Sequence, residues 1–110
     1  MHPRFLFAVL LLSACSSTFA ASVFTTRLDD PKAVYLTEEQ FGAHADGKTD
    51  DASAIQAAID KAEGTGHEGI VFVPSGRYRL TRTVYVWPGV RIFGYGATRP
   101  VFMLADNTPG

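Results

Sequence analysis

The chain has 110 residues, of which 46% are apolar and 12% aromatic, enough for one packed domain rather than a disordered tail. Its formal net charge of -1 creates no basic field, and the arginines between positions 77 and 99 are scattered among apolar residues, so nucleic acid is not an expected partner. The single cysteine, Cys15, excludes an intrachain disulfide and any metal site built from several thiolates.

Residues 1–20, MHPRFLFAVLLLSACSSTFA, have the layout of a signal peptide, with Arg4 before a short apolar run at residues 5–12. That run is far shorter than the ~20 residues of a membrane-spanning helix. Leu12-Ser13-Ala14-Cys15 resembles a bacterial lipobox, whereas Thr18-Phe19-Ala20 suits ordinary signal peptidase, and both processing routes stay open. We expect export to the periplasm, the extracellular space or the outer membrane, with membrane contact only through a lipid on Cys15.

Residues 21–40 mix polar and apolar types without sustained periodicity, and Pro31 would interrupt a helix. We interpret this segment as an extended leader. Within it, residues 34–36 could add a short strand to a sheet edge, and residues 37–39 could form a turn.

From position 52 apolar residues recur at spacings of three and four, which predicts an amphipathic helix with one buried face. The residues of that face are Ala52, Ile55, Ile59 and Ala62. Ala54, Ala57 and Ala58 widen the apolar band and raise helix propensity. Gly64 and Gly66 then allow the chain to leave the helix.

Three polar residues, Thr49, Asp50 and Asp51, precede this helix and can accept hydrogen bonds from the free N–H groups of its first turn. Acidic charge at that end also favours the helix dipole. We favour this helix-capping role over a metal or acid–base role for the two aspartates.

Asp46-Gly47 predicts a turn in which Gly47 takes a positive φ and the Asp46 carboxylate accepts bonds from nearby backbone amides. The segment lacks the alternating oxygen donors and the closing glutamate of an EF-hand, so we assign no metal site to it. His44 and His67 have no partner at ligand spacing and are interpreted as surface or loop histidines.

In the second half of the chain, short β-branched or aromatic runs alternate with Pro-Gly and Gly turn signals, which predicts strands and no second helix. The expected strands are residues 70–73, 78–80, 83–86, 90–93 and 101–104. Similar runs recur after about 20 residues, which fits successive coils of a parallel β-solenoid stacked ~4.8 Å apart. The periodicity alone also fits a small β-sandwich.

Four motifs occur in order, namely Phe41-Gly42-Ala43, Asp46-Gly47-Lys48-Thr49-Asp50-Asp51, Ala54-Ile55-Gln56-Ala57-Ala58-Ile59 and Val71-Phe72-Val73-Pro74-Ser75-Gly76-Arg77-Tyr78. Together they resemble the N-terminal segment of the pectate-lyase-like superfamily, and more narrowly its polygalacturonase and rhamnogalacturonase-related branch. Residues 90–96, VRIFGYG, resemble that family's next coil with its Gly-x-Gly turn. The resemblance covers about residues 34 to 104.

The resemblance implies a mainly β fold, in which residues 41–110 form a capping α-helix and the first coils of a right-handed parallel β-helix. In this family the helix covers the open N-terminal end of the solenoid, whose exposed strand edges would otherwise invite aggregation. Solenoids need roughly three or more repeats, and about two are apparent here. Residues 106–110 suggest a turn leading onward, so we expect a truncated sequence.

The implied function is that of an exported glycoside hydrolase or polysaccharide lyase acting on pectin-like, uronic-acid-rich glycans. The alternative is a non-catalytic β-helix that serves as a surface adhesin or glycan-binding spike. In the resembling enzymes the catalytic carboxylates come from later coils, so we assign no catalytic, cofactor-binding or metal residue to this segment. Calcium is expected only if the parent protein is a lyase.

A polysaccharide is the expected partner in either class. Tyr85 and Trp87 could stack on sugar rings, but Trp87 precedes Pro88-Gly89 and could equally cover a turn.

Overall fold

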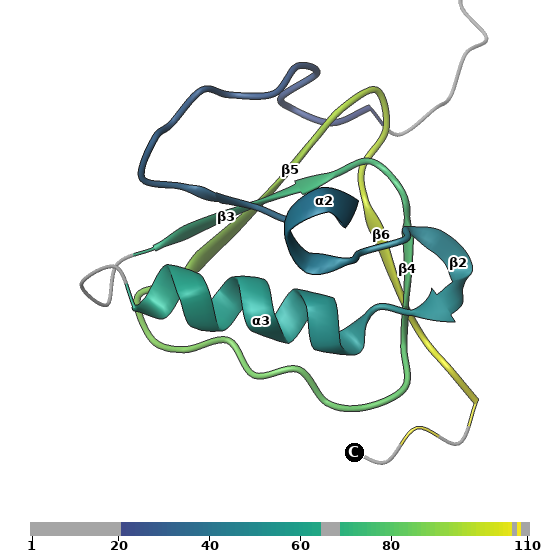
Figure 1. The fold of residues 1–110 in the computed structure, drawn as a ribbon. Helices are drawn as coiled ribbons and strands as arrows, with labels where there is room; N and C mark the ends of the chain where they lie inside the picture. Colours follow the sequence, from purple (N-terminus) through teal and green to yellow (C-terminus); the bar gives the residue numbers. More distant parts are fainter. Residues whose placement is uncertain (1–20, 65–68, 107, 109–110) are drawn as a thin grey trace, which may run out of the picture.

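The computed structural model describes residues 21–64, 69–106 and 108 (Figure 1). The predictions for Cys15, Gly66 and His67 lie outside these residues. In chain order the elements are β1 (Val34–Tyr35), α2 (Glu38–Phe41), β2 (Asp46–Asp50), α3 (Ala52–Glu63), β3 (Ile70–Pro74), β4 (Arg77–Leu80), β5 (Arg91–Tyr95) and β6 (Val101–Leu104).

The strands form two three-stranded sheets, ordered β1-β3-β5 and β2-β4-β6, in which all pairs are parallel. The chain therefore alternates between the sheets, and each return places a strand beside its predecessor in the same sheet. Ile70 is paired with Arg91, and Arg77 is paired with Val101. The predicted mainly β chain with parallel strand pairing is confirmed, and the recurrence of similar runs in the sequence reflects this register.

The core lies between the inner faces of the strands and one face of α3. The predicted helix face is buried as expected, because Ala52, Ile59 and Ala62 have no exposed surface and Ile55 has 4%. Ile55, Ile59 and Ala62 pack with Val71, Val73, Tyr78 and other apolar residues in one continuous cluster. Gly69 lies so close to the end of α3 that a Cβ on it would overlap the carbonyl of Ala62, which explains the need for glycine here.

The opposite face of the first sheet carries a ladder of aromatic rings, because side chains alternate between the two faces of a strand. Strand register places Tyr35 beside Phe72, and Phe72 beside Phe93. The ring centroids are 5.4 Å and 6.0 Å apart in these two pairs. This ladder explains why the sheet is apolar on both faces.

The leader, residues 21–33, crosses from the β5 end of this sheet to β1 (Figure 1). At one end Phe24 forms a parallel bridge with Tyr95, and the N–H of Gly96 donates to the carbonyl of Phe24 at 2.9 Å. At the other end the Tyr35 hydroxyl accepts a bond from the Asp30 N–H at 2.8 Å and donates to the carbonyl of Leu28. The leader is thus fastened to the first and the last strand of one sheet.

The predicted edge strand at residues 34–36 is confirmed as β1, which lies at the edge of its sheet. The turn expected at residues 37–39 was wrong, because Thr37 caps the short helix α2 and its hydroxyl accepts a bond from the Gln40 N–H. This helix ends at Gly42, which has a φ of 73°. Across the described residues, no helix has the length and apolar character needed to cross a membrane.

The predicted strand at residues 83–86 was also wrong, and β2 was not predicted at all. Residues 83–86 have strand-like composition, but the N–H and C=O of Tyr85 both bond to the side chain of Gln56 on α3 instead of to a strand. β2 consists of polar and glycine residues without apolar alternation, and its pairing with β4 is irregular between Asp46 and Asp50. The strand conformation of β2 therefore depends on its pairing with β4.

Candidate functional site

Asp51 is a buried carboxylate that organises the turn before β2. Its side chain is 1% exposed, and its two oxygens accept bonds from the backbone N–H groups of His44 and Ala45, each at 2.9 Å. Ala45 has a φ of 54°, which is uncommon for a residue other than glycine. Asp51 occupies the N-cap position of α3 but makes no side-chain hydrogen bond to the helix. Its carboxylate stabilises the turn at residues 43–46.

Asp50 links the start of α3 to the end of β4. Its Oδ1 accepts the N–H of Ala52, the first residue of the helix, at 3.1 Å, and its Oδ2 accepts the Thr81 hydroxyl at 2.7 Å. The bond from the Thr81 hydroxyl is the main reason that the pKa of Asp50 lies below its ordinary value. Thr49 points elsewhere, since its hydroxyl donates to Asp46. Among the three expected capping residues, Asp50 thus contacts a first-turn N–H.

The Asp46-Gly47 turn has the predicted geometry. Gly47 has a φ of 75°, and Oδ1 of Asp46 accepts the N–H groups of Lys48 and Thr49 at 2.9 Å and 2.8 Å. Hydrogen bonds from the backbone of Thr49 and then of Lys48 lower the pKa of Asp46 to about 2. All three aspartates of this segment therefore bind backbone or hydroxyl groups of the protein itself.

His44 lies at the surface, with its Nδ1 3.9 Å from Oδ1 of Asp51. Within residues 21–64, 69–106 and 108, no three His, Cys, Asp or Glu side chains are grouped in a way that could hold a metal ion.

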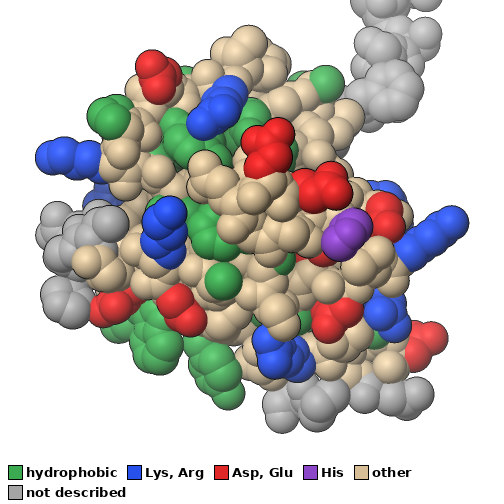
Figure 2. Space-filling view, viewed as in Figure 1, with side chains coloured by type: hydrophobic (Ala, Val, Ile, Leu, Met, Phe, Trp, Pro, Cys, Tyr) green, Lys and Arg blue, Asp and Glu red, His purple; other side chains and the backbone are tan. Residues whose placement is uncertain are grey.

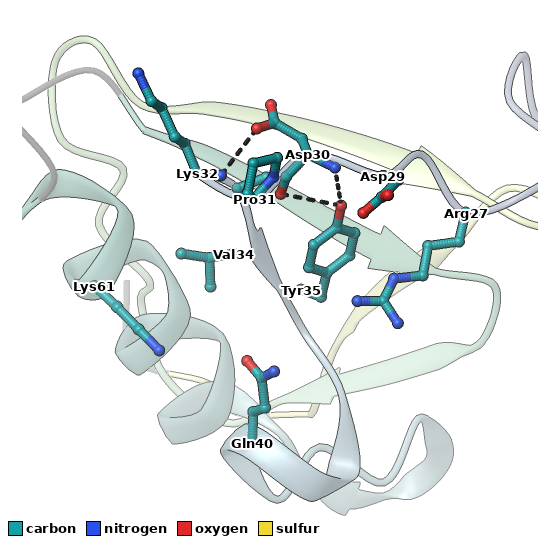
Figure 3. A pocket seen from close by; sticks show the side chains of 10 residues that line it. Arg27, Asp29, Asp30, Pro31, Lys32, Val34, Tyr35, Gln40 and Lys61 are labelled. Atoms are coloured by element: carbon teal, nitrogen blue, oxygen red, sulfur yellow. Dashed lines mark hydrogen bonds between the residues drawn. The ribbon is translucent and has the colours of Figure 1, made fainter.

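A polar hollow of about 510 Å³ lies where the leader meets α2 and α3 (Figure 3). The guanidinium of Arg27 lies 4.0 Å from the centre of the Tyr35 ring, within range of a cation–π contact. Lys32 and Lys61 also line the hollow, as do Asp29 and Asp30. The mixture of charges suits a polar ligand, but Asp30 accepts the N–H of Lys32 and Arg27 covers Tyr35, so these groups already stabilise the leader.

A second hollow, of about 330 Å³, lies between α3 and the segment 82–87. Tyr85 and Trp87, the aromatic residues singled out in the sequence, both line it. They remain 64% and 44% exposed. The structure therefore places both rings at the surface beside α3, where they can contact a ligand.

Three polar residues of this second hollow were not predicted from the sequence: Gln56, Asp60 and Arg82. Gln56 and Asp60 are four residues apart on the exposed side of α3, a pattern that is usual for any solvated helix. Gln56 contacts Tyr85, 29 residues away, and Asp60 contacts Trp87, 27 residues away. The spacing of residues in the sequence therefore gave no indication of these contacts.

The family model described as rhamnogalacturonase A/epimerase, pectate lyase-like, matches residues 39–110. The matched region begins in α2 and includes α3 and all strands from β2 onward. No solved structure gives a significant match.

Curated relatives include alginate lyase 7 of Azotobacter vinelandii, 43% identical over 76 residues, or 63% of this chain and 9% of the relative. Mannuronan C5-epimerase AlgE3 of the same organism is 34% identical over 96 residues, or 77% of this chain and 5% of the relative. A glucan 1,3-beta-glucosidase of Cochliobolus carbonum is 38% identical over 60 residues, or 54% of this chain and 7% of the relative. The chain thus spans less than a tenth of the length of each.

Proposed function

The chain belongs to the rhamnogalacturonase A/epimerase family of pectate lyase-like proteins, and on this premise we propose that it forms the N-terminal part of an exported, polysaccharide-modifying β-helix protein. In this proposal the two parallel sheets are the first coils of a right-handed parallel β-helix, and α3 covers its N-terminal end. Further coils follow in the full-length protein, as the small share of the relatives that is matched suggests.

The observation that carries the proposal is the strand register. Alternate strands return to the same sheet in parallel, so that β3 and β4 lie beside β5 and β6 with matched residues in both sheets. Stacked repeats of this kind bury a continuous core, and their terminal repeats need a cover. The buried face of α3, packed on Val71 and Val73, provides an apolar cover of this kind.

We propose that the substrate is a uronic-acid-rich polysaccharide and that the active site lies in later coils. The relatives named for alginate and mannuronan support an acidic polysaccharide, whereas the glucosidase supports a neutral one. Within the described residues, Asp46, Asp50 and Asp51 are engaged in turns and strand connections. A hydrolase would use two carboxylates of the later coils. A lyase would instead use calcium-binding acids and a basic residue there that abstracts a proton.

Export is the second part of the proposal. The signal-like residues 1–20 support it, with either lipid attachment at Cys15 or cleavage before Ala21. The carbonyl of Ala21 accepts a bond from Arg99 at 3.3 Å. Cleavage at this point would leave the leader from Ala21 onward intact, including its contacts with β5 and β1.

The test uses the full-length gene product, incubated separately with polygalacturonate, rhamnogalacturonan, mannuronan and β-1,3-glucan. New reducing ends report hydrolysis, ultraviolet absorbance reports the unsaturated products of a lyase, and proton NMR reports epimerisation. We expect activity on at least one acidic polymer and none from the 110-residue chain alone. Binding without turnover would instead support the adhesin or spike, and activity restricted to β-1,3-glucan would contradict the proposed substrate.

A further inference from the structure

The connection between β4 and β5 runs along α3 and is fixed to it by side chains of the helix (Figure 1). Arg82 donates to the Ser53 hydroxyl at 2.7 Å, near the start of the helix. Gln56 forms two hydrogen bonds with the backbone of Tyr85. Its Oε1 accepts the Tyr85 N–H at 2.8 Å, and its Nε2 donates to the Tyr85 carbonyl at 3.1 Å. The segment 82–87 is therefore anchored at intervals along α3.

Trp87 is anchored through its ring. The indole Nε1–H donates to Oδ1 of Asp60 at 2.7 Å, although 44% of the residue is exposed. A half-exposed tryptophan without a partner would sample several rotamers, whereas this bond restricts the orientation of the ring. The ring therefore loses its conformational entropy when the protein folds, and little more is lost when a ligand binds.

The segment beside α3 exposes three consecutive apolar side chains to solvent. Tyr85, Val86 and Trp87 are 64%, 52% and 44% exposed in three consecutive positions. Figure 2 shows hydrophobic side chains gathered beside acidic ones at the lower edge of the molecule, below α3. Contiguous exposed apolar surface with a polar border is typical of a binding site.

The polar groups of the hollow fit hydroxyl groups. Gln56 and Trp87 both donate to Oδ1 of Asp60, and no donor among the described residues contacts its Oδ2. These two hydrogen bonds, first that of Trp87, also hold the pKa of Asp60 below its ordinary value, so the carboxylate is charged at neutral pH. A hydroxyl can donate to Oδ2, whereas a ligand carboxylate would be repelled by it.

We propose that Tyr85 and Trp87, with Asp60, form an accessory subsite that binds a neutral pyranose ring, one that occurs among the uronic acids of the proposed substrate. The apolar C–H face of the sugar stacks on the indole, and a hydroxyl of the sugar donates to Oδ2 of Asp60. The subsite lies on α3, apart from the active site placed in later coils. It rests on the proposed action on polysaccharides, but binding is measured without turnover, so either proposal can fail alone.

Trp87 is the only tryptophan of the 110-residue chain, so its intrinsic fluorescence reports on this subsite alone. The test titrates the chain with a β-1,3-gluco-oligosaccharide and, separately, with an oligomannuronate of equal length. We expect saturable quenching or enhancement with the neutral sugar and at least tenfold weaker binding of the acidic one. Calorimetry on the full-length gene product, with the same two sugars, provides a measurement that does not depend on the short chain.

Three variants test the residues, and a far-ultraviolet dichroism spectrum checks that each is folded. In calorimetry, Trp87→Ala and Tyr85→Ala should weaken neutral-sugar binding at least about tenfold, since each removes a large aromatic face. Val101→Ala is the control, because it removes exposed apolar surface from β6, outside the hollow, and it should leave affinity within twofold. Absent binding, equal affinity in the tryptophan variant, or tighter binding of oligomannuronate would each overturn the proposal.

Discussion

At the scale of single residues, Asp51 illustrates how a charged group can be buried in a small protein. Its carboxylate is buried yet accepts two backbone N–H groups, which removes most of the cost of burying it. One of those amides belongs to Ala45, whose positive φ is held in place by the bond. Asp51 thus occupies the N-cap position of α3, but its side chain stabilises the preceding turn.

We expect Asp51→Ala to destabilise the protein by about 3 kcal/mol, because two part-buried N–H groups lose the buried carboxylate that accepts their hydrogen bonds. Urea denaturation followed by circular dichroism measures the change. Asp29→Ala, at an exposed acidic position of the leader, is the control and should change stability little. In an active full-length protein, Asp51→Asn should leave turnover of the folded enzyme nearly unchanged. A loss of several hundredfold with stability intact would show that the acid cluster takes part in catalysis.

Asp46 should give stability a pH dependence of known sign. Its pKa is about 2 in the folded chain, against an ordinary value of 3.8, because the N–H groups of Thr49 and Lys48 bond to the ionised form. A lowered pKa stabilises the fold above the unfolded value, and that stabilisation is lost as pH falls from about 4 toward 2. The difference in melting temperature between wild type and Asp46→Ala should therefore shrink over this range.

An NMR titration of the Asp46 carboxyl carbon provides the direct measurement. A midpoint near the ordinary pKa of 3.8 would mean that the turn bonds are not maintained in solution.

At the scale of elements, α3 contributes to the core through one face and holds a loop with the other. Ile59 has no exposed surface, and two turns of the helix bring Ala52 and Ile55 to the same side. On the solvent side Ser53, Gln56 and Asp60 bond to Arg82, Tyr85 and Trp87. The loop after β4 consequently follows the helix instead of pairing with a strand.

Ile59→Asp should destabilise the chain by roughly 3 kcal/mol or more, because it places an unpaired carboxylate in the core or forces it to take up a proton. Thermal unfolding and the soluble yield would report the loss. Ala57→Asp introduces the same side chain two positions earlier on the exposed side of α3, and it should retain wild-type stability within about 1 kcal/mol. Similar effects of the two substitutions would mean that the helix does not cover the sheets.

At the scale of the whole molecule, β6 lies at the edge of the second sheet, whereas the leader covers part of the β5 edge through the bridge between Phe24 and Tyr95. Phe102 and Leu104 on β6 are 44% and 71% exposed. Edge strands with apolar side chains associate readily. We expect the 110-residue chain to self-associate at high concentration in analytical ultracentrifugation, and Phe102→Lys to reduce this. A chain that stays monomeric over the full concentration range would contradict the expectation.

Export also concerns the whole molecule. In a bacterial host the precursor should lose residues 1–14 or residues 1–20, and intact mass spectrometry should detect either a lipid-modified Cys15 or a new N-terminus at Ala21. Cys15→Ser should abolish membrane partitioning only if the lipid route is used. Recovery of an intact precursor in the cytoplasm would refute export.

The sequence by itself determined the features that depend on local pattern. The helical face of α3, the runs of β3 to β6 and the Asp46-Gly47 turn were all predicted, because spacing and turn chemistry act over a few residues. The order of motifs also indicated the family, since it combines several weak signals in a fixed order.

Only the tertiary structure decided the features that depend on residues distant in the chain. β2 is polar and becomes a strand because β4 lies beside it, whereas residues 83–86 have strand composition but bond to Gln56. Asp50 precedes the helix α3, yet its Oδ2 accepts the hydroxyl of Thr81, 31 residues away. Hydrogen bonds between groups about 30 residues apart leave no periodic signal, so the partners of these groups appear only when the chain is folded.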